Sequence, residues 1–134
     1  MGTRSLVRFF DDGKELVTIY QQFDGYPSGV GKELAAFLQS GKQVNGLTME
    51  KNPPRKFNGM GCMAAQFIAQ FKTEAGGLYI QKPGAKDCGE DFTYEVRGGF
   101  DRNPLRVTVK TDAKIFDGNV SDFAAWCVKK EEEE

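Results

Sequence analysis

Two neighbouring segments in which apolar and polar residues alternate are the feature that most constrains the fold. In "DFTYEV" (residues 91–96) and in "LRVTVK" (residues 105–110), every second residue is aromatic or aliphatic. This period of two is typical of a β-strand with one covered face and one open face. The intervening "RGGFDRNP" predicts that the two strands form a hairpin.

The rest of the chain supplies further strands and the helices that would cover the sheet. "SLVRFFDDGKELVTIYQQF" (residues 5–23) predicts a β-hairpin around Asp12-Gly13, a dipeptide suited to a type I′ turn. Apolar residues at helical spacing predict a helix over residues 30–40, and the charge-free residues 60–71 predict a helix buried on nearly all sides. A last helix is expected from residue 120. The pattern indicates an α+β domain, mostly antiparallel, with about three helices on one face.

Length and charge restrict the organisation further. With 134 residues we expect one domain over residues 1–130, followed by an acidic tail over residues 131–134. Within the domain, the loop before the second helix is expected to contain one short strand near residues 44–49. The nineteen acidic residues include the four terminal glutamates, so eighteen basic residues face fifteen acidic ones elsewhere. This small excess does not favour nucleic acid as a partner, since binding to phosphate backbones needs a clustered basic face.

Histidine is absent from the sequence, which removes histidine-based catalytic triads and histidine metal sites. The three cysteines are widely spaced and form no zinc-binding or disulfide pattern, which favours a reducing compartment. No apolar run approaches the length of a membrane span, and no signal peptide is recognisable. We therefore expect a cytoplasmic protein without membrane contact and without a cofactor.

The glycine-rich "QFDGYPSGVGKE" (residues 22–33) precedes a helix and invites comparison with phosphate-binding loops. It does not fit the Walker A pattern, because Tyr26 and Glu33 stand where that motif requires glycine and a hydroxyl residue. Two interpretations remain open. The helix start with Gly29, Gly31 and Lys32 could bind an anion, or Ser28 caps the helix and the glycines only permit a tight turn.

Two weaker candidates concern catalysis and metal binding. Cys62 lies in the first turn of an expected helix, where the helix dipole can activate a thiol, but burial in the core is the favoured interpretation. Asp87, Glu90 and Asp91 could hold a hard cation, although clustered acids in a turn are usually solvated.

Basic side chains next to aromatic ones suggest a binding function instead. Arg8 interrupts an apolar strand, and a charge there needs either a partner or a ligand. Arginines together with Tyr26 would suit a nucleotide-like ligand, because guanidinium groups bind phosphate and rings stack on bases. The alternative is that these arginines are exposed strand residues paired with nearby acids.

Several segments, namely "MGTRSL", "YQQFDGYPSGVGKELAAFL", "NGMGCMAAQF" and the late "FDG", together resemble an uncharacterised group of small proteins from bacteriophages, large viruses and metagenomes. The resemblance implies a phage or viral context, hence the host cytoplasm, and little about chemistry. It singles out residues 3–5 and 24–27 as matching the family pattern, and suggests that these two segments meet.

The sequence thus favours a non-enzymatic binding protein that forms homo-oligomers and takes a small anionic ligand, for instance by sequestering a nucleotide signal. The alternatives are an enzyme that uses Cys62 or a carboxylate-bound metal, and a structural or host-interaction module without a small ligand. The residues expected at the ligand are Arg4, Arg8, Asp24, Tyr26, Gly29, Gly31 and Lys32.

Overall fold

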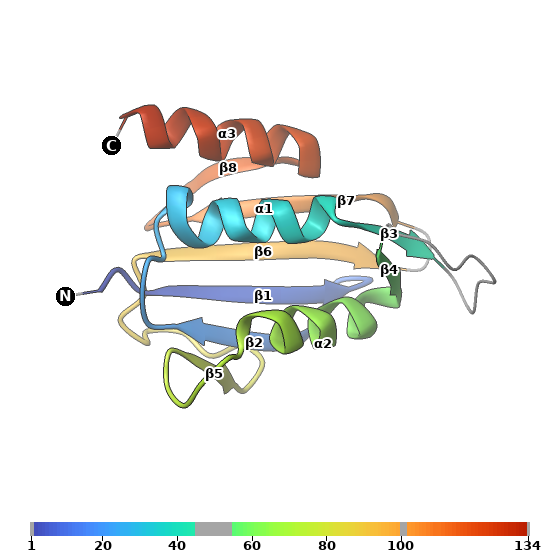
Figure 1. Cartoon of the computed structure of the whole chain (residues 1–134), viewed down its shortest axis with the longest axis horizontal. Helices are drawn as coiled ribbons and strands as arrows, with labels where there is room; N and C mark the ends of the chain where they lie inside the picture. The colour runs from blue at the N-terminus through green and yellow to red at the C-terminus, as the bar shows by residue number, and fades with distance from the viewer. Residues whose placement is uncertain (1, 45–54, 100–101, 134) are drawn as a thin grey trace.

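The computed structural model describes residues 2–44, 55–99 and 102–133, with side-chain detail from residue 105 in the last range. Within these ranges the chain forms a single α+β domain with eight strands and three α-helices, the first of which follows a π-helical turn, η1. Figure 1 shows the helices gathered on one face of the large sheet, as the sequence predicted. In chain order the elements are β1 (Ser5–Asp11), β2 (Lys14–Gln21), η1 (Pro27–Gly31), α1 (Lys32–Gln39), β3 (Gly41–Val44), β4 (Arg55–Asn58), α2 (Gly59–Phe71), β5 (Leu78–Gln81), β6 (Phe92–Gly99), β7 (Arg102–Lys110), β8 (Lys114–Asn119) and α3 (Val120–Glu133).

The large sheet has the strand order β5-β2-β1-β6-β7-β8. Its pairings are antiparallel except for β1 with β6, which run parallel at the centre of the sheet. The small sheet pairs β3 with β4 in parallel. At the β1–β2 turn, Asp12 and Gly13 have φ angles of 48° and 83°, which confirms the predicted turn chemistry.

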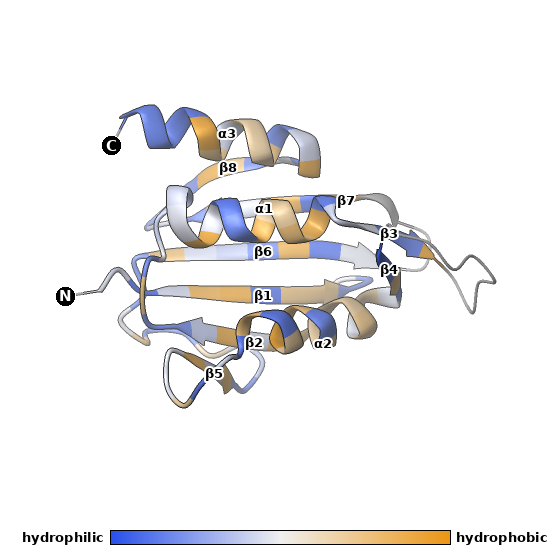
Figure 2. Cartoon of the chain, in the orientation of Figure 1, coloured by the Kyte–Doolittle hydropathy of each residue, from blue (hydrophilic) through white to orange (hydrophobic). Residues whose placement is uncertain are grey.

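The alternating residues of β6 and β7 divide between the two faces as predicted. Tyr94, Val96, Val107 and Val109 are fully buried beneath the helices, together with Phe9 of β1. In Figure 2, β6 carries a hydrophobic segment between two hydrophilic ones. The polar residues in between point to the opposite side of the sheet, which we call the open face.

The core beneath the helices is rich in phenylalanine. Phe37 of α1 contacts Phe57 of β4 and Phe67 of α2 with ring centroids 5.1 and 5.3 Å apart. In α3, Phe123 and Cys127 are buried against the same core. These contacts fix all three helices on one face, and consequently leave the charged residues of β6–β8 on the other.

Several local predictions were wrong. Helix α2 is buried only on the side of Met60, Met63, Ala64 and Phe67, whereas its small residues Gly61, Ala65 and Ala69 are exposed. These small residues count as apolar in the sequence, but they lose little free energy in water because they have little surface to bury.

Three boundaries also differ. The strand expected near residues 44–49 is β3 at Gly41–Val44, and residues 45–54 lie outside the described ranges. The residue that caps the first helical turn is Tyr26, followed by Pro27, so Ser28 is not the cap. Glu131 to Glu133, expected as an acidic tail, form the exposed last turn of α3.

Candidate functional site

The two segments singled out by sequence, residues 3–5 and 24–27, do meet. The Gly25 amide donates a hydrogen bond of 2.9 Å to the Thr3 carbonyl oxygen. A side chain on Gly25 would lie 2.8 Å from Ser5 Cβ, so the two backbones touch. Tyr26 Oη in turn donates to Asp24 Oδ1 at 3.0 Å. The predicted proximity is therefore confirmed, and it consists of close packing.

The helix start beside these segments has its amide groups already occupied. The amides of Gly29 and Gly31 donate to the Tyr26 carbonyl oxygen at 2.9 and 3.4 Å, and that of Val30 donates to the Asp24 carbonyl oxygen at 2.7 Å. A helix N-terminus binds an anion through free amide groups. These three amides donate to carbonyl oxygens of the chain itself, so they are not available to an anion.

The charge around this helix start is also unfavourable for an anion. Burial raises the pKa of Glu33, and the nearby Asp24 carboxylate raises it further. Two carboxylates that repel one another here would repel a phosphate as well. Lys32, the expected cation, reaches Glu131 of α3 with an Nζ–Oε1 distance of 3.0 Å.

The glycines of this segment are needed for packing. A Cβ atom on Gly29 would overlap the Asp24 carbonyl oxygen, and one on Gly31 would lie 3.0 Å from Cys127 Sγ and 3.4 Å from Tyr94 Oη. A Cβ atom closer than 3.0 Å to backbone cannot be accommodated without a shift of the chain. The turn interpretation of residues 22–33 therefore accounts for Gly29 and Gly31 without a ligand.

Arg8 is paired inside the protein. Its guanidinium group donates to Glu15 Oε1 at 2.7 Å, to Thr18 Oγ1 at 2.8 Å and to the Ala85 carbonyl oxygen at 2.6 Å. Only 11% of the side chain is exposed, and Glu95 lies 4.0 Å away. Burial acts to raise the pKa of Glu15, but the hydrogen bonds from Thr18 and Arg8 outweigh it and leave that pKa below its ordinary value. Arg8 thus joins the segment after β5 to the open face.

Arg4 organises the turn before β6. Its amide donates to Asp91 Oδ2 at 3.2 Å, and its carbonyl oxygen accepts from the Asp91 and Phe92 amides at 2.8 and 3.3 Å. Its guanidinium lies beside Gly89. The Arg4 backbone therefore packs against Gly25, while its guanidinium group lies beside the acidic turn.

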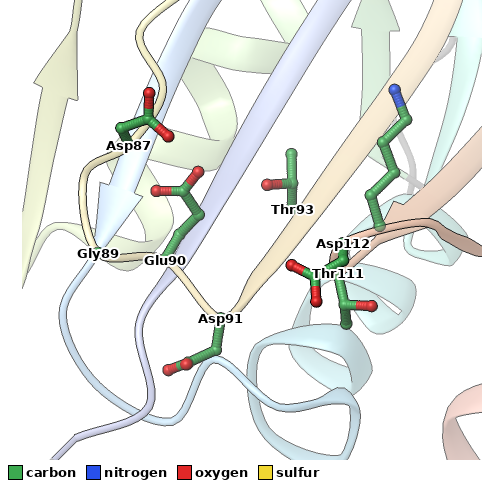
Figure 3. A pocket seen from close by; sticks show the side chains of 8 residues that line it. Asp87, Gly89, Glu90, Asp91, Thr93, Thr111 and Asp112 are labelled. Atoms are coloured by element: carbon green, nitrogen blue, oxygen red, sulfur yellow. The ribbon is translucent and has the colours of Figure 1, made fainter.

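The carboxylates proposed as a weak metal site border a hollow of about 420 Å³, which we call the acidic hollow. Figure 3 shows the Asp91 side chain directed away from those of Asp87 and Glu90. Glu90 Oε1 accepts a hydrogen bond from the Cys88 amide at 2.7 Å. Across the described ranges no three side chains are arranged to hold a metal ion, so the structure does not assemble this site. The hollow is lined by Asp87, Gly89, Glu90, Asp91, Thr93, Lys110, Thr111 and Asp112.

Cys62, the weak catalytic candidate, is half-buried on α2, so the prediction of full burial was wrong. Its Sγ accepts a hydrogen bond from Gln66 Nε2 at 3.3 Å, one turn along the same helix. With no histidine in the sequence, no general base of the usual kind accompanies this thiol. The buried cysteine is Cys127.

A second hollow on the open face, of about 270 Å³, collects four cationic side chains around two carboxylates. Arg97 and Lys110 contact Glu95 at 2.8 and 3.3 Å. We call it the basic hollow. It is lined by Glu95, Arg97, Arg106, Thr108, Lys110, Lys114 and Asp117.

The far side of the basic hollow has the same arrangement. Arg106 and Lys114 contact Asp117 at 2.8 and 3.4 Å. The hydrogen bond from Arg106, reinforced by Lys114, holds the pKa of Asp117 below its ordinary value. Each carboxylate thus orients two cations, and the hollow retains two positive charges that its own acids do not balance.

The sequence analysis did not single out Lys110 or Lys114. The available signal was the outward position of these residues in alternating strands. What the sequence lacked was the pairing of β7 with β8, which brings Lys114 and Asp117 to the same hollow.

Comparison with known proteins found no matching family model, no match among curated proteins and none among solved structures. In the ranges that the structure describes, no helix has the length and apolar character needed to cross a membrane. The functional argument therefore depends on the geometry of the open face.

Proposed function

We propose that this chain binds a small anionic ligand, of the phosphate-bearing kind, in the basic hollow of the open face. The observation that carries the proposal is the excess of four cations over two carboxylates around one hollow of about 270 Å³. Paired surface charges usually balance one another, whereas these leave two positive charges directed at a common space. A phosphate group would supply the missing negative charge.

The hollow supports recognition as well as attraction. Arg97 and Arg106 stand on adjacent strands as cross-strand partners, and guanidinium groups bind phosphate through two parallel hydrogen bonds. Thr108, which follows Arg106 on the same face of β7, donates its hydroxyl hydrogen to Asp117 Oδ1 at 3.4 Å and so helps to hold that carboxylate at the hollow. Glu95 is only 8% exposed and anchors Arg97 and Lys110 from below.

The proposal places the ligand away from the helix start that the sequence suggested. It keeps the expected ligand class and the expected kind of function, binding without catalysis. Resemblance to phage and viral proteins gives this function a context: in an infected cell, such a site would serve to sequester a nucleotide signal in the host cytoplasm.

Isothermal titration and thermal shift with inorganic phosphate, pyrophosphate and a nucleoside monophosphate test the proposal. We expect the Lys114→Gln variant to bind about tenfold more weakly, because a charge-assisted hydrogen bond contributes about 1.5–3 kcal/mol. Lys129→Gln is the matched control, since Lys129 is exposed on α3 away from the open face. If none of the three anions binds, or if both variants weaken binding equally, the proposal is wrong.

A further inference from the structure

The open face is covered over only part of its width. The segment between β5 and β6 lies over β1, where Ala85 accepts a hydrogen bond from Arg8 and where Leu6 is fully buried. On β7 and β8, by contrast, the side chains of Arg106 and Lys114 are 60% and 56% exposed. Among the described residues, the β6–β8 part of this face is thus open to a partner.

Charges on this uncovered part form bands across the strands. Cross-strand pairing sets them in register, and successive bands lie two residues apart, or about 7 Å. The outermost band consists of Asp91, just before β6, and Asp112, just after β7, which both line the acidic hollow. From one end of the strands to the other, the bands are Arg97 with Arg106, Glu95 with Asp117, Lys110 with Lys114, and Asp91 with Asp112.

The signs of these four bands alternate as positive, negative, positive, negative. Read from the opposite end, the order is negative, positive, negative, positive. Consider a second copy placed face to face with the first by a two-fold axis that is parallel to the two sheets and perpendicular to their strands. The rotation reverses the order of the bands along the strands, so every band would lie against one of opposite sign. An isologous interface requires this kind of self-complementarity.

We propose that two copies of this chain associate face to face through β6–β8, with strands antiparallel across the interface. The arrangement places Asp112 of each copy against Arg106 of the other, and so supplies cations to the acidic band. Within one chain, Asp91 accepts the Arg4 amide, and the four neighbouring cations are already shared by Glu95 and Asp117. This association is a property beyond ligand binding: it uses cations of the basic hollow, so bound phosphate should compete with it, but it does not require that phosphate binds.

The size of the surface sets the expected strength. Strands β6, β7 and β8 have eight, nine and six residues. With strands about 4.8 Å apart and a rise of about 3.3 Å per residue, they cover only about 14 by 26 Å. This is below the area of a standard stable interface, so we expect a weak and reversible dimer. Because the contacts are between exposed charges, added salt should dissociate it.

Sedimentation equilibrium of the full chain tests the proposal, at low ionic strength and again at high ionic strength. We expect a monomer–dimer equilibrium at low salt that shifts to monomer at high salt. Asp112→Lys and Arg106→Glu should each weaken self-association at least about tenfold, because each variant sets like charges opposite one another. Lys129→Glu on α3 is the charge-changing control and should leave association unchanged.

Mixing the two variants gives the decisive result. In the mixed pair, Lys at 112 faces Glu at 106 and the remaining Arg106 faces the remaining Asp112, so the dimer should reappear. A wild-type chain that stays monomeric at low salt, or a mixture that stays monomeric, would overturn the proposal. Asp112→Lys leaves the basic hollow intact and should still bind inorganic phosphate, so failure of the dimer is distinguishable from failure of the ligand site.

Discussion

Replacing Gly29 by alanine tests whether the glycine-rich segment serves packing or ligand binding. The added Cβ atom would overlap the Asp24 carbonyl oxygen, which also accepts the 2.7 Å hydrogen bond from the Val30 amide. Asp24 has a φ of 58°, a region that a non-glycine residue adopts reluctantly, so its backbone has little freedom to move away.

The expected cost follows from three contributions. Overpacking costs about 1–3 kcal/mol, and loss of the Val30–Asp24 hydrogen bond costs about 1 kcal/mol. The better helix propensity of alanine stabilises the variant by up to about 1 kcal/mol and so offsets part of this loss. The free energy of unfolding of Gly29→Ala should therefore fall by about 1–4 kcal/mol.

Urea unfolding followed by Trp126 fluorescence measures this change. With a denaturant dependence of about 2 kcal/mol per molar, the midpoint should fall by about 0.5–2 M. Gly61→Ala is the control, because nothing lies within 4 Å of its added Cβ and it is helical and exposed, so its midpoint should stay or rise. A Gly29→Ala variant as stable as the wild type but deficient in phosphate binding would refute the packing argument.

Three further predictions concern other residues. The pKa of Glu15 is lowered in the folded protein, so its contribution to stability is complete above its ordinary pKa of 4.5 and is lost as the pH falls through the lower folded-state value. Glu15→Gln should therefore flatten the acid side of a plot of Tm against pH, and an unchanged slope would contradict the Arg8 network. Ellman's reagent should modify Cys62 and Cys88 in the native protein and reach the fully buried Cys127 only after unfolding, and rapid reaction of all three thiols would disprove the packing of α3. Lys32→Gln should change the free energy of unfolding by less than about 0.5 kcal/mol, because the ion pair of Lys32 with Glu131 is exposed. Its phosphate affinity should equal that of the wild type, and a large loss of affinity would indicate that the ligand binds at the helix start.

Much of the fold follows from periodicity. The strand faces of β6 and β7 were predictable because side chains of a strand alternate strictly, and the Asp12-Gly13 turn because few dipeptides accept positive φ at both positions. The burial of α2 could not be predicted in the same way. Glycine and alanine count as apolar but are also found in contact with water, as Gly61, Ala65 and Ala69 are in this helix.

The candidate site depends on contacts that the local sequence does not encode. Arg8 looked like a ligand-binding residue because its partners Glu15, Thr18 and Ala85 come from a neighbouring strand and from a segment 77 residues away. Gly31 looked like part of an anion loop because its neighbour Cys127 belongs to the last helix. Only the strand order and the helix packing reveal these partners.

The most direct test of the ligand site is a titration of the isotopically labelled protein with inorganic phosphate, followed by nuclear magnetic resonance. We predict saturable shifts at the side chains of Arg97, Arg106 and Lys110, and none at the amides of Gly29 to Gly31. Shifts confined to those helix-start amides, or no saturable shift on the open face, would contradict the account.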